Sequence, residues 1–493
     1  MPFMLFYKMC YNVVGDIMKK LSEIFNTSDE TLIKDVKTNS NEIEKRDLFV
    51  CIKGFNVDRH DYVKQAEENG AAALVVNHKV NSNLPQIVVS DINKELYNIV
   101  DKVYEKPSNK MIMIGITGTD GKTSTSTIIS EFLNQVSSCG YIGTNGVSSK
   151  NYSSASNNTT PTYEHLNRFL YNFNKTGCKY VCMEAGSEGL AQGRCQGIMF
   201  DYSVFTNLTH EHLNFHKTME AYLNAKETLF KQTKKSGYSF LNSEDKYSKR
   251  IEEICNGKVI YYGKGKNADF RFDNVIINPK YTEFDLITKT DTYHIKSPLL
   301  GMFNVYNLTA ALSVLITMGI DINKLDYSKL YVDGRMEDIN MNQDFKVIVD
   351  YAHTPNGYLN LFELTKTLNA KRTIIVAGSA GERDKTKRPL MGKILVDNAD
   401  LVVFTYEDPR SEDPNDIIDD LTSEVLDKKD KFIRIVDREE AINYAINEAK
   451  TGDMVLILGK GNETYEALKN GKIYFNDVEC AKKALEKRIK SRV

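Results

Sequence analysis

The sequence predicts an α/β protein of three domains that are built on mostly parallel sheets. At 493 residues the chain is too long for one hydrophobic core, and usual domain sizes divide it into about three. Short apolar runs alternate with stretches of helical periodicity, which is the pattern of strands followed by crossover helices. A glycine-rich turn at residues 115–123 separates one apolar run from one helical stretch. We place the domains at residues 1–108, 109–331 and 332–493.

Residues 31–105 combine short apolar runs with polar helical stretches and predict a small α/β domain. The predicted strands lie at residues 48–52, 71–76 and 86–89. Pro107, in the segment KPSNK, interrupts the periodicity and marks a linker to the next domain.

The chain begins with an apolar segment, MPFMLFYKMCYNVVGDIMKKL, that is interrupted by charges at Lys8 and Asp16. It has no small-residue cleavage site and no apolar run long enough to span a bilayer. We expect an amphipathic helix here, no membrane insertion, and a cytoplasmic protein. The eight cysteines form no CxxC pair and fit free thiols in a reducing compartment.

The middle of the chain predicts a strand, a turn and a helix at MIMIGITGTDGKTSTSTIISEFL. Further strands are expected at residues 180–183 and 202–205. Residues 257–296 alternate polar and apolar positions as β-structure does, and residues 301–320 read as a loop that enters an apolar helix.

The last third of the chain alternates apolar runs with helical patterns, which indicates a mostly parallel sheet. Its predicted strands lie at residues 346–349, 373–377, 401–405 and 454–458.

Charge composition argues against one class of partner. The 64 basic residues nearly balance the 66 acidic ones, and no basic stripe or tail is present. Proteins that bind nucleic acid concentrate positive charge, so we expect no nucleic-acid partner.

The glycine-rich turn GITGTDGKT, residues 115–123, predicts a phosphate-binding loop. It follows a strand and opens a helix, so backbone N–H groups can surround phosphate oxygens at the helix N-terminus. Lys122 would reach the terminal phosphates of ATP, and the hydroxyl of Thr123 would join the ligands of Mg²⁺. A turn with an incidental lysine is the alternative, which the flanking elements disfavour. The predicted loop comprises Gly118, Thr119, Asp120, Gly121, Lys122, Thr123 and Ser124.

The segment TGTDGKTST resembles the ATP loop of the Mur ligase family, which folylpolyglutamate synthase and cyanophycin synthetase share. Other motifs follow in the order of the family and extend the resemblance from about residue 31 to 475. They are LFVCIKGFN, TTPTYEHL, MEAGSEGLAQGR, FTNLTHEHLNFH, YLNAKETLF, GMFNVYN, GRME, DYAHTPN, EDPRSEDP and LGKGNET. The position of LFVCIKGFN before the phosphate loop distinguishes the chain from folylpolyglutamate synthase. The resemblance implies a small N-terminal α/β domain, a central P-loop ATPase-like domain and a C-terminal Rossmann-like domain.

The resemblance also implies site residues, and catalysis would depend on Lys122, Lys226, Glu184 and His212. The positions that bind the uridine diphosphate moiety correspond to Ser40, Phe55 and Asn56, and those that bind the muramoyl peptide to Thr159, Thr160 and Arg194. ATP would further contact Asn304, Arg335, Asp350 and His353. Glu184 and His212 would bind Mg²⁺ together with Thr123 and Lys226, which occupies the position of a carbamylated lysine, a source of anionic oxygen.

One motif contains more than one candidate metal ligand, and another departs from the sequence that is common in the family. His210, His212 and His216 lie in one short segment, and we favour His212 as the metal ligand because the family predicts one. Gly186 stands where the family commonly has a serine, which removes a hydroxyl near the peptide site.

The incoming amino acid would be bound by the C-terminal domain, at Arg383, Asp408, Arg410, Gly459 and Glu463. In relatives with a DNPR motif these positions bind meso-diaminopimelate, and the guanidinium of Arg410 can pair with the distal carboxylate that lysine lacks. This chain has Glu407 and Asp408 in place of the Asp-Asn pair. Asp408 can pair with Arg410 and loosen selection for a carboxylate, or attract the distal ammonium. We favour diaminopimelate over lysine.

The resemblance therefore implies ATP-dependent addition of meso-diaminopimelate to UDP-N-acetylmuramoyl-L-alanyl-D-glutamate through an acyl-phosphate, in peptidoglycan precursor synthesis. Two alternatives stay open within the family: addition of L-lysine, or action on a specialised muramoyl peptide. From another class, the chain could be a nucleotide-binding P-loop regulator without ligase chemistry. We expect small-molecule partners only, the cofactors ATP and Mg²⁺, and a monomer.

Overall fold

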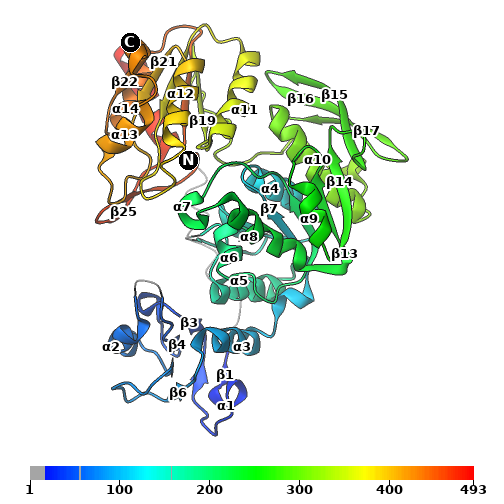
Figure 1. The fold of residues 1–493 in the computed structure, drawn as a ribbon, viewed down its shortest axis with the longest axis vertical. Coiled ribbons are helices and arrows are strands. Elements are labelled where there is room, and N and C mark those ends of the chain that lie inside the picture. The colour runs from blue at the N-terminus through cyan, green and yellow to red at the C-terminus, as the bar shows by residue number, and fades with distance from the viewer. Residues whose placement is uncertain (1–16, 55–56, 157, 493) are drawn as a thin grey trace.

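The structure, a computed structural model, describes residues 17–54, 57–156 and 158–492. Phe55, Asn56 and residues 1–16 of the expected N-terminal helix lie outside these ranges. The helix expected in that segment is wrong for residues 17–20, because β1 (Lys19–Lys20) pairs with β2 (Leu32–Ile33); the short helix α1 (Leu21–Ile24) begins only at Leu21. Three units are arranged in a row, with the N-terminal unit at the bottom and the C-terminal unit at the top (Figure 1).

The N-terminal unit is a four-stranded parallel sheet in the order β3-β4-β5-β6. The strands are β3 (Val36–Lys37), β4 (Leu48–Val50), β5 (Ala73–Val76) and β6 (Gln86–Val88), and the helices are α2 (Val63–Glu68) and α3 (Ile92–Tyr104). The three strands predicted in this domain are confirmed, and β3 was not anticipated. Contacts with helix α5 (Tyr163–Lys175) of the central unit hold the domain in place: the Tyr163 hydroxyl donates to Asp101 of α3 at 2.8 Å, and Arg168 pairs with Asp35, just before β3, at 3.0 Å.

The central unit contains an eleven-stranded sheet in the order β10-β9-β8-β11-β7-β12-β13-β14-β15-β16-β17. Strands β8 to β15 in this order run parallel, and antiparallel strands extend both edges. The bounds are β7 (Ile112–Thr117), β8 (Cys139–Gly143), β9 (Gly146–Ser149), β10 (Tyr152–Ser154), β11 (Tyr180–Glu184), β12 (Phe200–Phe205), β13 (Thr233–Asn242), β14 (Lys258–Gly263), β15 (Phe270–Asn278), β16 (Tyr281–Ile287) and β17 (Thr292–Ser297). The β-structure expected at 257–296 is therefore confirmed.

Helices cover both faces of this sheet, and strand β7 divides its side chains between two cores with a period of two. Ile114 and Ile116 belong to one core and Met113 to the other. The helices are α4 (Lys122–Val136), α5 (Tyr163–Lys175), α6 (Ser187–Ala191), α7 (Leu213–His216), α8 (Met219–Lys231), α9 (Ser248–Ile254) and α10 (Met302–Thr317).

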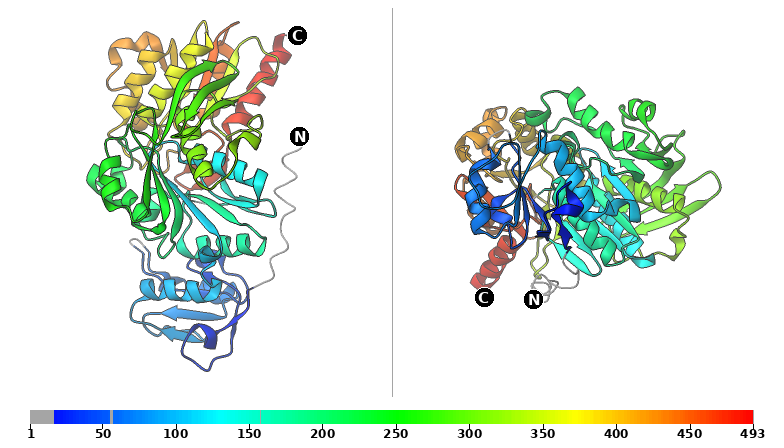
Figure 2. Two further views of the ribbon diagram at one scale, coloured as in Figure 1. Left: turned by 90° about the vertical axis from the view of Figure 1, so that its right-hand side faces the viewer. Right: turned by 90° about the horizontal axis from the view of Figure 1, so that it is seen from below.

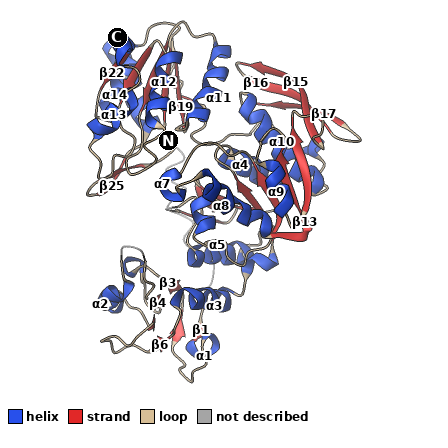
Figure 3. Ribbon diagram, in the orientation of Figure 1, coloured by secondary structure: helices blue, strands red, loops and turns tan. Residues whose placement is uncertain are grey.

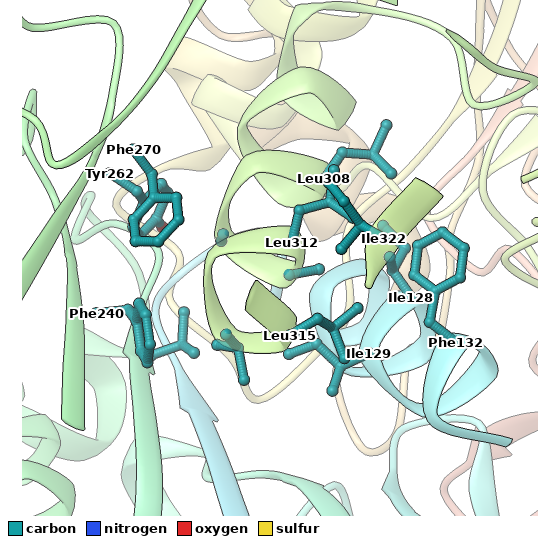
Figure 4. Packing of buried hydrophobic residues seen from close by; sticks show 14 of the residues in the cluster. Ile128, Ile129, Phe132, Phe240, Tyr262, Phe270, Leu308, Leu312, Leu315 and Ile322 are labelled. Atoms are coloured by element: carbon teal, nitrogen blue, oxygen red, sulfur yellow. The ribbon is translucent and has the colours of Figure 1, made fainter. Parts of the chain in front are cut away.

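Helix α10 is buried on most of its circumference, as its nearly uniform apolar sequence predicts. Figure 4 shows its leucines packed between helix α4 on one side and aromatic side chains of the strands on the other. The labelled residues are Leu308, Leu312 and Leu315 with Ile128, Ile129 and Phe132 of α4, Ile322, and Phe240, Tyr262 and Phe270 of the strands. This packing fixes the first turn of α10 beside the glycine-rich turn.

The C-terminal unit is a six-stranded sheet in the order β18-β19-β23-β20-β21-β22, parallel except for β18. The strands are β18 (Glu337–Asp338), β19 (Lys346–Asp350), β20 (Thr373–Ala377), β21 (Leu401–Phe404), β22 (Phe432–Arg434) and β23 (Met454–Leu458), with a separate hairpin of β24 (Tyr465–Leu468) and β25 (Gly471–Tyr474). The four predicted strands are confirmed, whereas the hairpin was not anticipated.

Helices lie on both faces of the C-terminal sheet, as expected for a doubly wound fold (Figure 3). Helices α11 (Pro355–Thr365), α12 (Arg388–Asn398) and α13 (Pro414–Thr422) cover one face, and α14 (Arg438–Glu448) and α15 (Asp477–Arg492) cover the other. Figure 2 shows the C-terminal unit stacked against the central unit, away from the N-terminal unit. Among the described residues, no helix combines the length and apolar character needed to cross a bilayer.

Candidate active site

A cavity of about 1420 Å³ lies between the central and C-terminal units. Its wall is formed largely by loops that follow the carboxyl ends of parallel strands, the usual place for ligands in doubly wound folds. The turn after β7 lies on the central side, and the turns after β19, β21 and β23 lie on the C-terminal side. The predicted ATP loop and the predicted amino-acid-binding residues therefore share one cavity.

The glycine-rich turn connects β7 to α4 with a backbone that requires glycine. Gly121 has φ +82°, and a Cβ built there would lie 2.6 Å from Oδ1 of Asn307 on α10. Lys122 Nζ donates to the carbonyl oxygens of Gly118 at 3.0 Å and Thr119 at 2.8 Å. Burial lowers the pKa of Lys122, so an anion near this ammonium would be strongly favoured.

Glu184 is fully buried at the end of β11, and four donors fix its carboxylate. Oε2 accepts from the Thr123 hydroxyl at 3.0 Å and from the Thr144 hydroxyl at 3.2 Å. Oε1 accepts from the Tyr141 hydroxyl at 2.7 Å and from the Thr144 N–H at 2.9 Å. The predicted metal ligands Thr123 and Glu184 are thus hydrogen-bonded to each other beside the ATP loop.

Lys226 is buried on α8, with only 1% of its surface exposed. Its Nζ donates to Gly118 O at 2.6 Å and lies 4.5 Å from the ring centre of Tyr222. Burial, reinforced by the charge of Lys122, lowers the pKa of Lys226 well below its ordinary value. A neutral amine is nucleophilic, so this environment suits the carbamylation that the resemblance implies.

The three histidines of residues 210–216 have different surroundings. His212 lines the cavity, with Nδ1 3.3 Å from Glu188 Oε1 and its ring against Tyr222. His210 pairs with Asp384 at 3.1 Å, and His216 hydrogen-bonds the Ser187 hydroxyl at 3.0 Å. Of these three, His212 is the one on the cavity wall, consistent with the choice made from the sequence.

The predicted metal ligands all line the cavity: Thr123 is hydrogen-bonded to Glu184, and His212 and Lys226 each contact the ring of Tyr222. Within the described residues, no group of three or more His, Cys, Asp or Glu side chains is arranged to hold a metal ion. This donor set fits Mg²⁺, which commonly binds through one or two carboxylates and completes its shell with phosphate oxygens and water.

Asp350 and Arg335 lie on the C-terminal side of the ATP loop. The Asp350 carboxylate accepts from the N–H groups of Met336 and Ala352, both at 2.8 Å, and burial raises its pKa. The Arg335 guanidinium lies 4.5 Å from the ring centre of Tyr351. Both predicted ATP residues therefore have defined positions on the wall.

His353 and Asn304 differ in their relation to the cavity. His353 lines it, and burial together with the charge of Lys387 lowers its pKa well below the ordinary value. Asn304 is buried inside the first turn of α10, where it donates to Leu300 O at 2.8 Å and accepts from Asn307 at 3.2 Å. Among the described residues it is Asn307 of this pair that lines the cavity.

The residues predicted to hold the muramoyl peptide lie together. The Thr160 hydroxyl donates to Glu184 O and accepts from Gly186 N, both at 2.9 Å, and Arg194 donates to Thr160 O at 2.7 Å. Thr159 is 3.1 Å from Thr144 through their hydroxyls. A Cβ at Gly186 would meet the Thr160 hydroxyl at 3.5 Å, an ordinary contact, so space does not explain the missing serine.

Ser40 lies in the N-terminal unit, remote from the described residues that line the cavity. It is buried, and its hydroxyl donates to Gln65 at 2.8 Å. Phe55 and Asn56, the other two predicted uridine contacts, lie outside the described residues.

The five predicted amino-acid-binding residues all line the cavity. Arg383 is 3.4 Å from Glu188 of the central unit, and Glu463 accepts from the Tyr351 hydroxyl at 3.1 Å. Gly459 has φ +115°, and a Cβ there would lie 2.3 Å from Glu407 Oε1.

Three charged residues of this region were missed from the sequence. Glu407 is buried on the cavity wall, where burial raises its pKa to about 7 and Oε1 has no hydrogen-bond partner among the described atoms. Lys460, inside the motif LGKGNET, bonds Asp408 and Glu463. Of these two partners Glu463 lies in the same motif, whereas Asp408 lies 52 residues earlier in the chain.

The third missed residue, Lys387, connects the two units. Its Nζ donates to both carboxylate oxygens of Glu211, at 2.9 and 2.8 Å, and to His353 O at 2.9 Å. The ATP loop contributes a second connection, because the Asp120 carboxylate accepts from Thr354 at 3.3 Å and from the Asn356 amide at 3.1 Å.

Comparison with known proteins agrees with this geometry. Residues 32–109 match the model described as Mur ligase family, catalytic domain; residues 116–315 match the Mur ligase middle domain; residues 334–461 match the Mur ligase, glutamate ligase domain. The chain is 39% identical over 463 residues to the UDP-N-acetylmuramoyl-L-alanyl-D-glutamate–2,6-diaminopimelate ligase of Bacillus licheniformis, covering 92% of this chain and 94% of the relative. It is 36% identical to the UDP-N-acetylmuramyl-tripeptide synthetase 2 of Oceanobacillus iheyensis, covering 94% and 96%.

Solved structures give the same result for the fold. A UDP-N-acetylmuramoyl-L-alanyl-D-glutamate–2,6-diaminopimelate ligase superposes with a TM-score of 0.62 at 27% identity, over 96% of this chain and 99% of the other. The MurF ligase of Thermotoga maritima in complex with ADP superposes with a TM-score of 0.69 at 21% identity, over 93% and 98%. The fold and the site define an ATP-dependent ligase that forms amide bonds. The chain belongs to the Mur ligase family.

Proposed function

We propose that this chain adds meso-diaminopimelate to UDP-N-acetylmuramoyl-L-alanyl-D-glutamate with consumption of ATP, which extends a peptidoglycan precursor. The observation that carries the proposal is the shared cavity, whose wall contains both the ATP loop and the cluster of Arg383, Arg410 and Glu463. The names of the relatives at 35–39% identity support the same substrates.

The first half of the reaction is phosphoryl transfer. The γ-carboxylate of D-glutamate attacks the γ-phosphorus of ATP, a bond to the β,γ-bridging oxygen breaks, and an acyl-phosphate and ADP form. The N–H groups of residues 118–124 surround the phosphates, and Lys122 exchanges its bonds with loop carbonyls for bonds with phosphate oxygens. Arg335, Asp350 and His353 bind ATP from the C-terminal side, and Asn304 positions Asn307 at the same turn.

The second half is acyl substitution. The free amine of diaminopimelate attacks the acyl carbonyl, a C–N bond forms, phosphate leaves, and the nitrogen loses a proton. Thr159, Thr160 and Arg194 orient the peptide, while Arg383, Asp408, Arg410, Gly459 and Glu463 hold the amino acid. Catalysis of this kind depends on positioning and charge neutralisation, so no nucleophilic side chain is required.

Thr123, Glu184, His212 and the carbamate of Lys226 would hold Mg²⁺, which neutralises charge on the transferred phosphoryl group when bound. The carbamate adds two anionic oxygens to a wall where Lys226 and Lys122 otherwise bring two amines to one carbonyl oxygen, Gly118 O. The fit of these residues to Mg²⁺ and the charge that the carbamate supplies both support the assignment of Glu184, His212, Lys122 and Lys226 as catalytic residues.

Each domain, which we place at residues 1–108, 109–331 and 332–493, binds a different substrate or part of a substrate. The N-terminal domain binds the uridine diphosphate moiety through Ser40, Phe55 and Asn56, the central domain binds ATP, and the C-terminal domain binds the amino acid. We further propose that the enzyme acts as a monomer, since one chain supplies every predicted residue, and that it works in the cytoplasm, where ATP is available.

A lysine-adding enzyme is the second candidate, and the specific feature in its favour is the negative charge of Asp408 beside Arg410. A P-loop regulator without ligase chemistry would bind ATP but would not release phosphate in response to an amino acid.

The test is phosphate release by the purified protein with ATP, Mg²⁺ and UDP-N-acetylmuramoyl-L-alanyl-D-glutamate. We expect release to depend on meso-diaminopimelate and a product heavier by one diaminopimelate less water. A higher kcat/KM for L-lysine would select the second candidate. ATP binding without release dependent on an amino acid would refute the ligase assignment.

A further inference from the structure

The acidic residue Asp408 lies two positions from Arg410 but is not closely paired with it. The Asp408 Oδ2 and Arg410 Nη2 atoms are 4.0 Å apart, the outer limit of an ion pair. Oδ1 of Asp408 instead accepts from Lys460 Nζ at 2.8 Å and from the Ala467 N–H at 3.1 Å. The aspartate therefore has a nearer cation than the arginine.

Lys460 is almost completely enclosed, with 1% of its side chain exposed. Its Nζ also donates to Glu463 Oε2 at 2.9 Å and lies 5.4 Å from the ring centre of Tyr465. Burial alone would lower the pKa of Lys460, but the carboxylates of Glu463 and Asp408 raise it above its ordinary value. A buried ammonium of this kind is stable only while its carboxylate partners are present, so Lys460 offsets the charge of Asp408 while it also pairs with Glu463.

Arg410 is held by its backbone and keeps donors available for a ligand. Its N–H donates to Ala467 O at 2.9 Å on strand β24, and its Nη1 donates to Gly381 O. The side chain is 25% exposed and lines the cavity. A guanidinium has five N–H donors in a fixed fork, so these contacts leave several donors free for a carboxylate.

We propose that Lys460 is a specificity-determining residue, because it neutralises Asp408 and thereby leaves the Arg410 guanidinium available for the distal carboxylate of the incoming amino acid. The inference rests on the proposed function and deepens it: the accepted substrates are amino acids with a carboxylate at the far end of the side chain. Without the lysine, the Asp408 carboxylate would turn toward Arg410 and compete with the distal carboxylate of the substrate for the guanidinium.

The test is a double-mutant cycle of Lys460→Met and Asp408→Asn, with kcat and KM measured for meso-diaminopimelate and for L-lysine. Lys460→Met should lower the ratio of kcat/KM for diaminopimelate to kcat/KM for L-lysine by at least about tenfold. The main change should be a higher KM for diaminopimelate, because Asp408 then pairs with Arg410. Asp408→Asn alone should keep or raise the ratio, because Arg410 stays free and the negative charge that could attract the distal ammonium is removed. The double variant should recover the ratio to within about threefold of the unsubstituted enzyme.

Recovery in the double variant distinguishes neutralisation of Asp408 from a structural role, since removal of a merely structural lysine would not be repaired by the second substitution. Lys469→Met is a control: Lys469 is exposed in the turn between β24 and β25 and is not among the described residues that line the cavity. Its removal should leave the ratio unchanged. Should Lys460→Met fail to fold, Lys460→Gln removes the same charge and keeps a hydrogen-bond donor.

The inference and the proposed function fail in different ways. A preference of the unsubstituted enzyme for L-lysine would overturn both. A preference for diaminopimelate that survives Lys460→Met, or that is not recovered in the double variant, would overturn the role of Lys460 alone.

Discussion

The ion pair between Lys387 and Glu211 offers the most direct test of how the two halves of the cavity are held together. Lys387 belongs to the C-terminal unit and Glu211 to the central unit, and their side chains are 5% and 8% exposed. The ammonium donates three hydrogen bonds of 2.8–2.9 Å, two to the Glu211 carboxylate and one to His353 O. Because Glu211 precedes His212 in the chain, this pair also fixes the segment that carries a proposed metal ligand.

We expect Lys387→Met to weaken closure of the domains rather than the fold of either one. Removal of one partner from a buried ion pair costs about 3–5 kcal/mol when the other charge stays buried. Here separation of the units would expose Glu211 to water. The free-energy cost of the unpaired charge would therefore destabilise only the closed state, in which the central and C-terminal units are in contact. A loss of about 3 kcal/mol corresponds to a decrease of about 150-fold in kcat/KM.

The assay is steady-state phosphate release, with small-angle scattering to follow the separation of the units. Lys387→Met should lower kcat/KM by about two orders of magnitude and increase the radius of gyration, with little change in the far-ultraviolet circular dichroism. The double variant Lys387→Met/Glu211→Leu removes the unpaired charge and should recover at least about tenfold, because apolar replacement of a buried pair is often neutral. A decrease below about threefold in the single variant, or no recovery in the double, would refute this reasoning.

Three further predictions concern single residues. Lys226→Ala should reduce activity by at least about a hundredfold, as loss of a catalytic charge does. The unsubstituted enzyme should lose activity when carbon dioxide and bicarbonate are removed. Activity that depends neither on Lys226 nor on carbon dioxide and bicarbonate would exclude the carbamate. Gly121→Ala should destabilise the central domain by about 1–3 kcal/mol and weaken ATP binding in calorimetry, because the backbone has φ +82° and the added Cβ would lie 2.6 Å from Asn307; unchanged ATP affinity would contradict the proposed loop. The pKa of His216 is lowered from 6.5 to about 4, chiefly by burial, so the folded state favours the neutral ring and its stability should fall as the pH decreases from about 6.5 to 4. Thermal denaturation of His216→Gln should lack this part of the pH dependence, and an identical pH profile would show that another group titrates.

The local motifs of the chain were sufficient to predict the main elements around the site. Strand β7, the turn and helix α4 follow from an apolar run, glycines and helical periodicity within residues 112–136, because each depends on neighbours in the sequence. The same holds for the four strands predicted in the C-terminal domain. The hairpin β24–β25 was missed, since its strands have four residues each and lie outside the main sheets, and β25 is exposed, which leaves no clear apolar pattern.

The interaction partners of individual side chains were harder to predict than the positions of the site residues in the sequence. The sequence raised the possibility that Asp408 pairs with Arg410, whereas the closest cation is Lys460, 52 residues further along the chain. Similarly, nothing near Lys387 indicates that Glu211, 176 residues earlier, receives its charge. Asn304 lies in the expected helix, but the direction of its side chain depends on how α10 packs, and its neighbour Asn307 is the one on the cavity wall.

The sequence by itself determined most of the longer strands and helices, the phosphate-binding turn and the types of residue at the site, because these depend on short-range periodicity and on backbone conformations that only certain residues adopt. The tertiary structure alone decided which charges neutralise one another, Lys387 with Glu211 and Lys460 with Asp408, and that Lys226 is enclosed beside Tyr222 without a carboxylate partner of its own among the described residues. Electrostatic energies depend on separation in space and on burial, and neither quantity can be obtained from separation along the chain.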